Sequence, residues 1–275
     1  MSTMIQAEGL LIRQEWISAC RFHDLTEAEV LREVGRRVSD LRSKAGSNRK
    51  AHPLVLLDLD STLYEVGPRT FRIIQEWIAD PRSQEFPKVR QTLSTLLMNQ
   101  VGYSMKDIFL TLGMNYEAPE NQPALTDIKK FWSDRFFANS YLQYDHAYPG
   151  AVHFARNLHE LGAEIVYLTG RDEPGMGDGT RANLIRDGFP WDIERTHLLM
   201  KAAFHLPDLD HKKNAAHYIR DHGTLVASFE NEPPNLIALY EIFPDAMHVF
   251  VDTVCSDHAA MPREGLYRIQ GFEIG

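Results

Sequence analysis

Two aspartates separated by a single residue follow a short apolar run in the first quarter of the sequence. Asp58 and Asp60 come directly after the apolar residues 53–57. On an extended chain, side chains two residues apart point to the same side. Carboxylates that close repel each other unless a cation lies between them, and Mg²⁺ is a cation that binds one or two carboxylates together with phosphate and water. One carboxylate could then attack phosphorus while the other moves protons, so the pair predicts phosphoryl chemistry.

A second apolar run, residues 164–168, ends in Thr169, Gly170 and Arg171. A hydroxyl and backbone N–H groups beside a small glycine form a compact cradle for a phosphate group. Arg171 could add a charged fork near the anionic part of a substrate. We therefore expect Thr169 to act in catalysis and Gly170 with Arg171 to bind the substrate.

A lysine follows the third apolar run, residues 198–200, and three candidates compete for its role. Lys201, Lys212 and Lys213 all come after this run. We prefer Lys212, because Ala216 and Ile219 then lie on its packing side at helical spacing. A point charge at this position neutralises an attacking carboxylate and the phosphoryl group being transferred. Lys213 is the alternative, and Lys201 is expected near the rim of the site.

The fourth apolar run, residues 224–229, is followed by Glu230, Asn231 and Glu232. A carboxylate here could complete the shell of a metal ion, since Mg²⁺ prefers oxygen ligands. We expect Glu230 and Asn231 to be the metal ligands from this segment, together with Asp58 and Asp60, and Glu232 remains an alternative.

These polar groups need a scaffold that brings four strand ends together. A fifth apolar run covers residues 247–251, and helical patterns lie at about 150–161, 180–187, 209–222 and 234–242. Strands that alternate with helices indicate an α/β fold, a Rossmann-like parallel sheet with helices on both faces. Ligands of such sheets bind at the carboxyl ends of the strands, where all four groups are expected.

Helical patterns also fill the long interval between the first two strands, which a simple connection would not need. The sequence therefore predicts three parts: an N-terminal helical extension and linker at 1–50, an α/β core at 51–63 and 149–275, and a helical cap at 64–148. Thr26 and Glu29 form a candidate capping box in the extension. Polar residues 43–50 are expected to be the linker, and the glycine-rich residues 175–180 a flexible loop with Thr180 as the N-cap of the next helix.

Taken in order, these motifs resemble those of the haloacid dehalogenase-like (HAD) superfamily over residues 53–252. The resemblance implies that Asp58 is a nucleophile that forms an aspartyl-phosphate, and that Asp60 is a general acid and then a base. It also implies that Thr169 binds the phosphoryl oxygen, that Lys212 stabilises charge, and that Mg²⁺ is held by Asp58, the Asp60 backbone carbonyl and the fourth motif. We place Ser61 and Thr62, beside the aspartates, among the substrate-binding residues. The second aspartate fits the phosphatase branch.

The fourth motif departs from the family pattern, which usually has aspartate where this chain has Glu230 followed by Asn231. Glutamate reaches about one carbon further and could still bind the metal directly or through water. Because one expected negative charge is missing, the departure leaves open a binding or regulatory protein on a catalytically weakened fold. A phosphotransferase and a phosphatase for nucleic-acid ends are further alternatives.

Composition narrows these choices. The net charge of −9 argues against a nucleic-acid partner, because no basic excess is present to neutralise phosphates. Two cysteines do not form a disulfide framework, and we see neither a signal peptide nor a membrane-spanning run, so we expect a cytoplasmic protein. The function we predict is Mg²⁺-dependent hydrolysis of a small phosphomonoester, and the N-terminal helices leave open a homo-oligomer.

Overall fold

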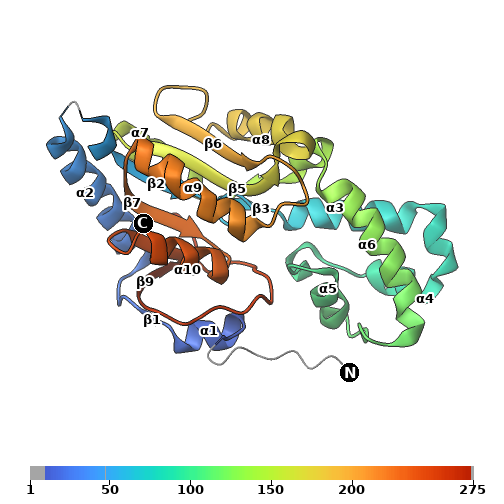
Figure 1. The fold of residues 1–275 in the computed structure, drawn as a ribbon. Helices are drawn as coiled ribbons and strands as arrows, with labels where there is room; N and C mark the ends of the chain where they lie inside the picture. The colour runs from blue at the N-terminus through green and yellow to red at the C-terminus, as the bar shows by residue number, and fades with distance from the viewer. Residues whose placement is uncertain (1–9, 47, 274–275) are drawn as a thin grey trace.

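A seven-stranded parallel sheet forms the centre of the molecule in the computed structural model, which describes residues 10–46 and 48–273. The strand order is β1-β9-β8-β7-β2-β5-β6, and every neighbouring pair runs parallel (Figure 1). The strands are β1 (Arg21–Phe22), β2 (Pro53–Leu57), β5 (Glu164–Asp172), β6 (Thr196–Lys201), β7 (Thr224–Glu230), β8 (Met247–Val251) and β9 (Glu264–Ile269).

Strand β2 lies at the point where the strand order reverses. Its neighbour on one side is β5, reached through the cap, and its neighbour on the other side is β7, reached later in the chain. The carboxyl end of a strand at such a switch point opens into a crevice, because the two flanking connections leave in opposite directions. The topology therefore places the residues after β2 at a natural binding position.

Helices cover both faces of the sheet, and the side chains of β2 point alternately to one face and to the other. Val55 and Leu57 point to one face, where they join the cluster formed by α2 (Glu27–Ala45), α7 (Ala151–Glu160) and the end of α8 (Glu173–Asp187). Leu54 and Leu56 point to the other face, against α9 (Asp208–His222) and α10 (Pro233–Ile242). The short helix α1 (Arg13–Ala19) packs beside α10 through Trp16. The predicted α/β class, with both faces covered, is confirmed.

The N-terminal helices are not a separate arm. Val30, Leu31, Val34 and Val38 of α2 are buried in the same cluster as the sheet, and β1 extends the sheet beside β9. The predicted capping box of Thr26 and Glu29 is present, since each residue's side chain binds the other's backbone N–H. The predicted linker, 43–50, begins too early. The helix runs on to Ala45 and ends at Gly46, whose φ of 55° suits glycine.

A helical cap follows β2 and projects to one side of the sheet (Figure 1). It contains α3 (Gly67–Ala79), α4 (Pro87–Leu93), α5 (Met105–Thr111) and α6 (Gln122–Phe136), and ends in the 3₁₀ segment Asn139–Tyr144. These helices share a hydrophobic core of their own, centred on Ile74, Trp77 and Phe131. The chain leaves and re-enters the core through an antiparallel pair, β3 (Tyr64–Glu65) and β4 (His146–Ala147). The division of the chain into three parts stays a prediction.

The glycine-rich residues 175–180 are helical, so the prediction of a flexible loop there is wrong. They lie inside α8, whose N-cap is Asp172, with a side chain that accepts a hydrogen bond from the Gly175 N–H. The predicted N-cap, Thr180, is buried in the middle of the helix. The cap and helix-start signals of Asp172 and Pro174 outweigh the low helix propensity of glycine.

None of the helices in the described ranges is long and apolar enough to cross a bilayer.

Candidate active site

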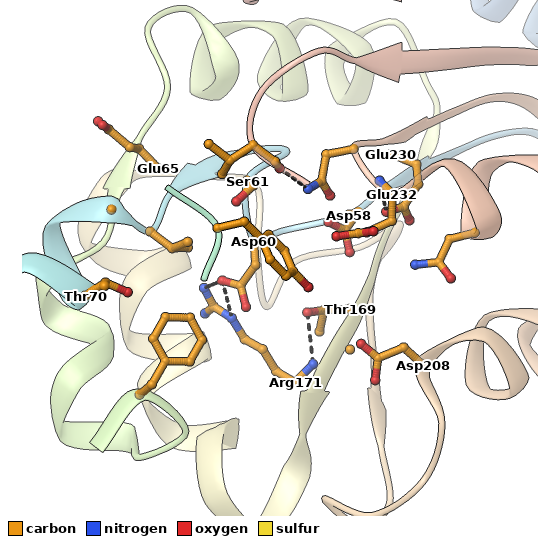
Figure 2. A pocket seen from close by; sticks show the side chains of 18 of the residues that line it. Asp58, Asp60, Ser61, Glu65, Thr70, Thr169, Arg171, Asp208, Glu230 and Glu232 are labelled. Carbon is orange, nitrogen blue, oxygen red and sulfur yellow. Dashed lines mark hydrogen bonds and ion pairs between the residues drawn. The ribbon is translucent and has the colours of Figure 1, made fainter. Parts of the chain in front are cut away.

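A cavity of about 270 Å³ lies at the carboxyl ends of β2, β5 and β7, beneath the cap. Figure 2 shows side chains from these strand ends pointing toward a common space. Most of the predicted site residues line it, namely Asp58, Asp60, Ser61, Thr169, Gly170, Arg171, Lys212, Glu230 and Asn231. The structure therefore brings together residues from four segments that are far apart in the sequence.

Thr62 is the exception among the predicted substrate-binding residues. It is fully buried behind the cavity wall, where its hydroxyl donates a 3.3 Å hydrogen bond to Oδ1 of Asn231. The Asn231 amide in turn donates to the carbonyl of Val254 at 2.7 Å. Thr62 thus fixes the orientation of Asn231 and has no direct access to a substrate. Its neighbour Ser61 lines the cavity and adopts a φ of 60°, a left-handed conformation that tightens the turn after β2.

The floor of the cavity holds two carboxylates that share one lysine. Nζ of Lys212, on α9, lies 2.7 Å from Oδ1 of Asp58 and also contacts Oε2 of Glu230, the last residue of β7. All three side chains are almost completely buried. Burial and the nearby charge of Glu230 raise the pKa of Asp58 to about 7, even though Lys212 opposes the shift.

The same contacts act on the other two groups. Burial raises the pKa of Glu230, and contact with Lys212 only partly offsets this effect. Burial alone would lower the pKa of Lys212, but the two carboxylates outweigh it and hold the pKa above its usual value. Lys212 therefore stays charged, and two ionised carboxylates would carry one negative charge more than its ammonium group can neutralise. A second cation at this position would relieve their repulsion.

The other two lysines considered for this role lie elsewhere. Lys213 is exposed on the outer side of α9. Nζ of Lys201 donates to the carbonyls of Phe204 and Leu206 and pairs with Asp208 at 2.8 Å, which closes a compact loop before α9. Only Lys212 therefore reaches the aspartate after β2 among these three.

The donor set around Asp58 suits Mg²⁺. Asp58 and Glu230 offer two carboxylates at one point, the peptide carbonyl of Asp60 follows directly, and Asn231 lines the same wall. No group of three or more His, Cys, Asp or Glu side chains in the described ranges is arranged to hold a metal ion. Two carboxylates are, however, what Mg²⁺ commonly takes from a protein when phosphate and water complete its shell. Glu232 also lines the cavity, but both of its carboxylate oxygens are engaged, since they accept from the N–H and hydroxyl of Ser256.

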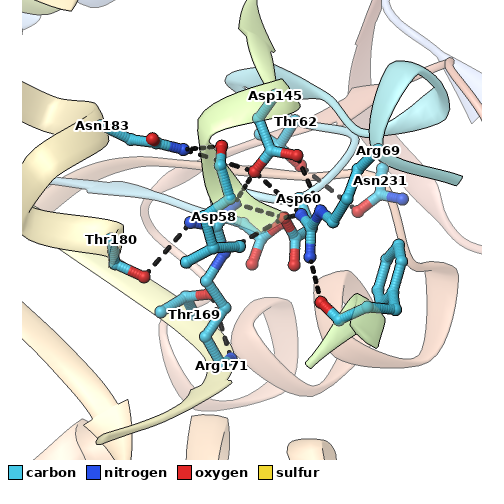
Figure 3. A network of polar contacts seen from close by, with 12 residues as sticks. Asp58, Asp60, Thr62, Arg69, Asp145, Thr169, Arg171, Thr180, Asn183 and Asn231 are labelled. Carbon is cyan, nitrogen blue, oxygen red and sulfur yellow. Dashed lines mark hydrogen bonds and ion pairs between the residues drawn. The ribbon is translucent and has the colours of Figure 1, made fainter. Parts of the chain in front are cut away.

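Asp60 is held by two arginines, one of them from the cap. Its Oδ1 accepts from Nη2 of Arg69 at 2.9 Å and from Nε and Nη2 of Arg171 at 3.1 and 2.5 Å. Both guanidinium groups also bind Asp145, which ends the cap (Figure 3). Burial opposes ionisation of Asp60, but the two arginines outweigh it and hold its pKa well below the usual range. Arg171 therefore binds carboxylates here instead of presenting a free fork to the substrate.

Thr169 and Gly170 shape the wall beside Asp58. Oγ1 of Thr169 accepts a 3.2 Å hydrogen bond from the N–H of Arg171, which fixes the threonine at the end of the apolar part of β5. A Cβ atom added at Gly170 would lie 2.3 Å from Oδ2 of Asp208, the first residue of α9, so the glycine leaves room for this carboxylate. The predicted cradle is thus a narrow one, closed on one side by Asp208.

Sequence reasoning did not find Arg69, Asp145 and Asp208. No local pattern in the sequence distinguishes Arg69 or Asp145 from surface charges of the cap. The aromatic side chains of Trp132, Phe136 and Phe137 in the cap also line the cavity. These residues become part of the site only through the docking of the cap on the sheet.

Fold and site together fit a phosphohydrolase, a phosphoric monoester hydrolase, with paired aspartates directly after a central parallel strand. Residues 115–224 match the model of the family described as HAD superfamily, subfamily IIIB (Acid phosphatase). The matched stretch contains Thr169, Gly170, Arg171 and Lys212 and begins after Asp58. No curated protein matches the chain in sequence.

Two solved structures illustrate the likeness in fold. A putative phosphatase from Clostridium difficile is 13% identical with a TM-score of 0.48, over 74% of this chain and 86% of that chain. The class C acid phosphatase from Bacillus anthracis, with tungstate bound, is 18% identical with a TM-score of 0.41, over 76% of this chain and 63% of that chain. Likenesses of this size carry no conclusion about the substrate of this protein.

Proposed function

We propose that the protein hydrolyses small phosphomonoesters with the help of Mg²⁺, through a phosphoryl group carried on Asp58. The observation that supports this most directly is the buried contact between Asp58 and Lys212 on the floor of a cavity of about 270 Å³. A carboxylate in this position is aimed at a bound phosphate, and the ammonium group stabilises the charge that develops during transfer. The small volume favours a small substrate.

The proposed reaction has two steps. An oxygen of Asp58 first forms a bond to phosphorus while the bond to the leaving oxygen breaks, and Asp60 gives that oxygen a proton. Water then attacks phosphorus and gives a proton to Asp60, the bond between phosphorus and the Asp58 oxygen breaks, and phosphate leaves with the Asp58 carboxylate regenerated. Thr169 and the backbone N–H groups beside Gly170 would hold the phosphoryl oxygens during both steps.

The charge state of Asp60 suits the second step without further change, because Arg69 and Arg171 favour its carboxylate form. For the first step Asp60 must carry a proton. The arrival of a phosphate dianion beside Asp58 favours this form, since a nearby negative charge raises the pKa of a carboxyl group.

Mg²⁺, held by Asp58, Glu230, the Asp60 carbonyl and Asn231, would supply positive charge that draws the phosphoryl group toward Asp58.

A cytoplasmic location is also our proposal. It is supported by Cys20 and Cys255, two buried free thiols of the kind that persist in a reducing compartment.

Hydrolysis of 4-nitrophenyl phosphate with Mg²⁺, with and without chelator, tests the proposal. Asp58→Asn should abolish turnover, because an amide oxygen is a poor nucleophile. Asp221→Asn, an exposed aspartate near the C-terminal end of α9 that pairs with Lys50, is the matched control and should keep full activity. Turnover that persists both in Asp58→Asn and in the presence of chelator would contradict the proposal.

A further inference from the structure

A buried network of two arginines and two carboxylates joins the cap to Asp60. Oδ1 and Oδ2 of Asp145 accept from Nε and Nη2 of Arg69 at 2.7 and 2.9 Å, and Oδ2 also accepts from Nη2 of Arg171 at 2.8 Å. The side chains of Arg69 and Asp145 are 0% exposed, whereas that of Asp60 remains 32% exposed. Asp60 and Arg171 are therefore the members of the network that line the cavity, and Arg69 and Asp145 are buried behind them.

The two carboxylate oxygens of Asp60 differ in their hydrogen bonds. All three of its hydrogen bonds, from Arg69 and from Nε and Nη2 of Arg171, end on Oδ1. Oδ2 receives no hydrogen bond from any side chain or backbone group in the described ranges. A carboxyl group anchored through one oxygen presents the other in a fixed direction, and this second oxygen is the one left to carry a proton.

Arg69 and Asp145 come from opposite ends of the cap. Arg69 lies in the first turn of α3, where its Nη1 also donates to the carbonyl of Phe136 at 2.9 Å and its guanidinium lies 4.1 Å from the centre of the Phe136 ring. Asp145 directly precedes β4, which returns the chain to the core. Phe136 lines the cavity, so the aromatic wall and Asp60 share one arginine.

Resting on the proposed function, we propose that Arg69 and Asp145 are positioning residues that orient Asp60 for proton transfer to the leaving group. They touch neither the phosphate nor Asp58. In the first step, the electron pair of the breaking P–O bond goes to the leaving oxygen, and the proton on Oδ2 of Asp60 passes to that oxygen and gives the neutral alcohol. Because a guanidinium group can bridge two carboxylates, Asp145 holds both arginines in the orientation that fixes Oδ1.

The test compares two aromatic esters of similar size by kcat/KM, which reports the steps up to cleavage of the P–O bond. Phenyl phosphate releases an oxygen that needs a proton, whereas 2,4-dinitrophenyl phosphate releases one that does not. Asp145→Asn and Arg69→Lys should each lower kcat/KM for phenyl phosphate about tenfold or more, because a general acid contributes roughly 10²–10⁴-fold. The loss for 2,4-dinitrophenyl phosphate should stay within about twofold, because its leaving group gains nothing from a general acid.

Arg186→Gln is the matched control. Arg186 anchors the same end of the cap through the carbonyls of Gln143 and Asp145, at 2.9 Å each, but does not contact Asp60. It should change kcat/KM for both esters by the same factor. Equal losses for the two esters in Asp145→Asn and Arg69→Lys, or no loss in either variant, would overturn the positioning role.

Two further outcomes remain distinguishable. If Asp145→Asn does not fold, the comparison of kcat/KM for the two esters is made with Arg69→Lys alone. This variant keeps the positive charge and removes only the bridging geometry. If the wild-type protein hydrolyses neither ester, the proposed function fails, and the positioning role fails with it.

Discussion

Lys212 holds two acids together that would otherwise repel each other inside the protein. Its Nζ contacts both Asp58 and Glu230, and none of the three side chains has appreciable access to water. Removing the counter-ion of a buried charge costs more than the pair itself contributes, because the remaining charge stays desolvated. Lys212 should therefore support the fold as well as the reaction.

We expect Lys212→Met to lower kcat at least about 100-fold, a typical loss for one electrostatic group at a reacting centre. In metal-free buffer at pH 8, it should also lower the free energy of unfolding by about 3 kcal/mol, since Asp58 and Glu230 are then buried without a counter-ion. Assays with 4-nitrophenyl phosphate and urea unfolding measure the two effects.

Lys213→Met is the control for this prediction, because Lys213 is adjacent in sequence and exposed. It should change neither quantity appreciably, and its free energy of unfolding should stay within about 0.5 kcal/mol of the wild type. Equal changes of kcat and of the free energy of unfolding in the two variants would mean that the buried contacts of Lys212 contribute neither to the reaction nor to stability.

At the residue scale, the sequence located the groups that follow apolar strands and missed those that arrive through the cap. Asp58 and Thr169 could be found because a strand end predicts where its next residues lie. Arg69 and Asp145 could not, because their proximity to Asp60 depends on how the cap docks on the sheet. The contact of Arg171 with Asp145, 26 positions away, could not be predicted for the same reason.

At the level of elements, helix α8 shows how glycine can serve packing inside a helix. A Cβ atom at Gly179 would lie 2.6 Å from the carbonyl oxygen of Asn139 and 2.8 Å from a methyl group of Leu142, both in the 3₁₀ segment that ends the cap. A Cβ atom at Gly177 would meet only the flexible ends of Glu173 and Arg181. The two glycines share one helix but have different surroundings.

Gly179→Ala should lower the free energy of unfolding by about 1–3 kcal/mol, because the backbone of the cap must move away from the added methyl group. Gly177→Ala is the matched control and should be neutral or raise it by up to about 1 kcal/mol, since alanine is the better helix former. Urea unfolding of both variants checks the difference. Equal destabilisation would mean that close packing of the cap against α8 is not the reason for Gly179.

The elements that could be predicted are those with a strong internal pattern. All five apolar runs are strands, although β5 continues four residues past the predicted end at Leu168. Strands β1 and β9 were missed, because β1 has two residues and β9 mixes exposed and buried positions at the edge of the sheet. Helix α8 was only half predicted, since propensity alone does not reveal a cap such as Asp172.

On the scale of the whole molecule, one buried histidine makes the fold sensitive to acid. His248 of β8 lies between the hydroxyl of Ser228 and the carbonyl of Phe243, each 2.8 Å from a ring nitrogen. Burial lowers the pKa of His248 from 6.5 to about 4. An unfolded chain would bind a proton here near pH 6.5 and the folded chain only near pH 4, so stability is retained above this interval and falls within it.

His248→Gln should lose less stability than the wild type between pH 7 and pH 4, because the side chain that must remain neutral is gone. The difference should reach about 3 kcal/mol at the acid end, following the size of the pKa shift. Urea unfolding across this pH range measures it, with His205→Gln, an exposed histidine, as control. Parallel pH profiles for wild type and His248→Gln would contradict the prediction.

The antiparallel pair of β3 and β4 has one more consequence. Tyr64 pairs with Ala147 and Glu65 with His146, so the whole cap leaves and returns at neighbouring positions. The two ends of the insert therefore lie side by side, as the two strands of a tight hairpin do, and this geometry does not depend on the length of the insert. The segment between β3 and β4 could become shorter or longer, or be exchanged, during evolution while the sheet still folds. Asp58, the proposed nucleophile, would stay in place, whereas Asp60 would need a new partner in place of Arg69 of the cap.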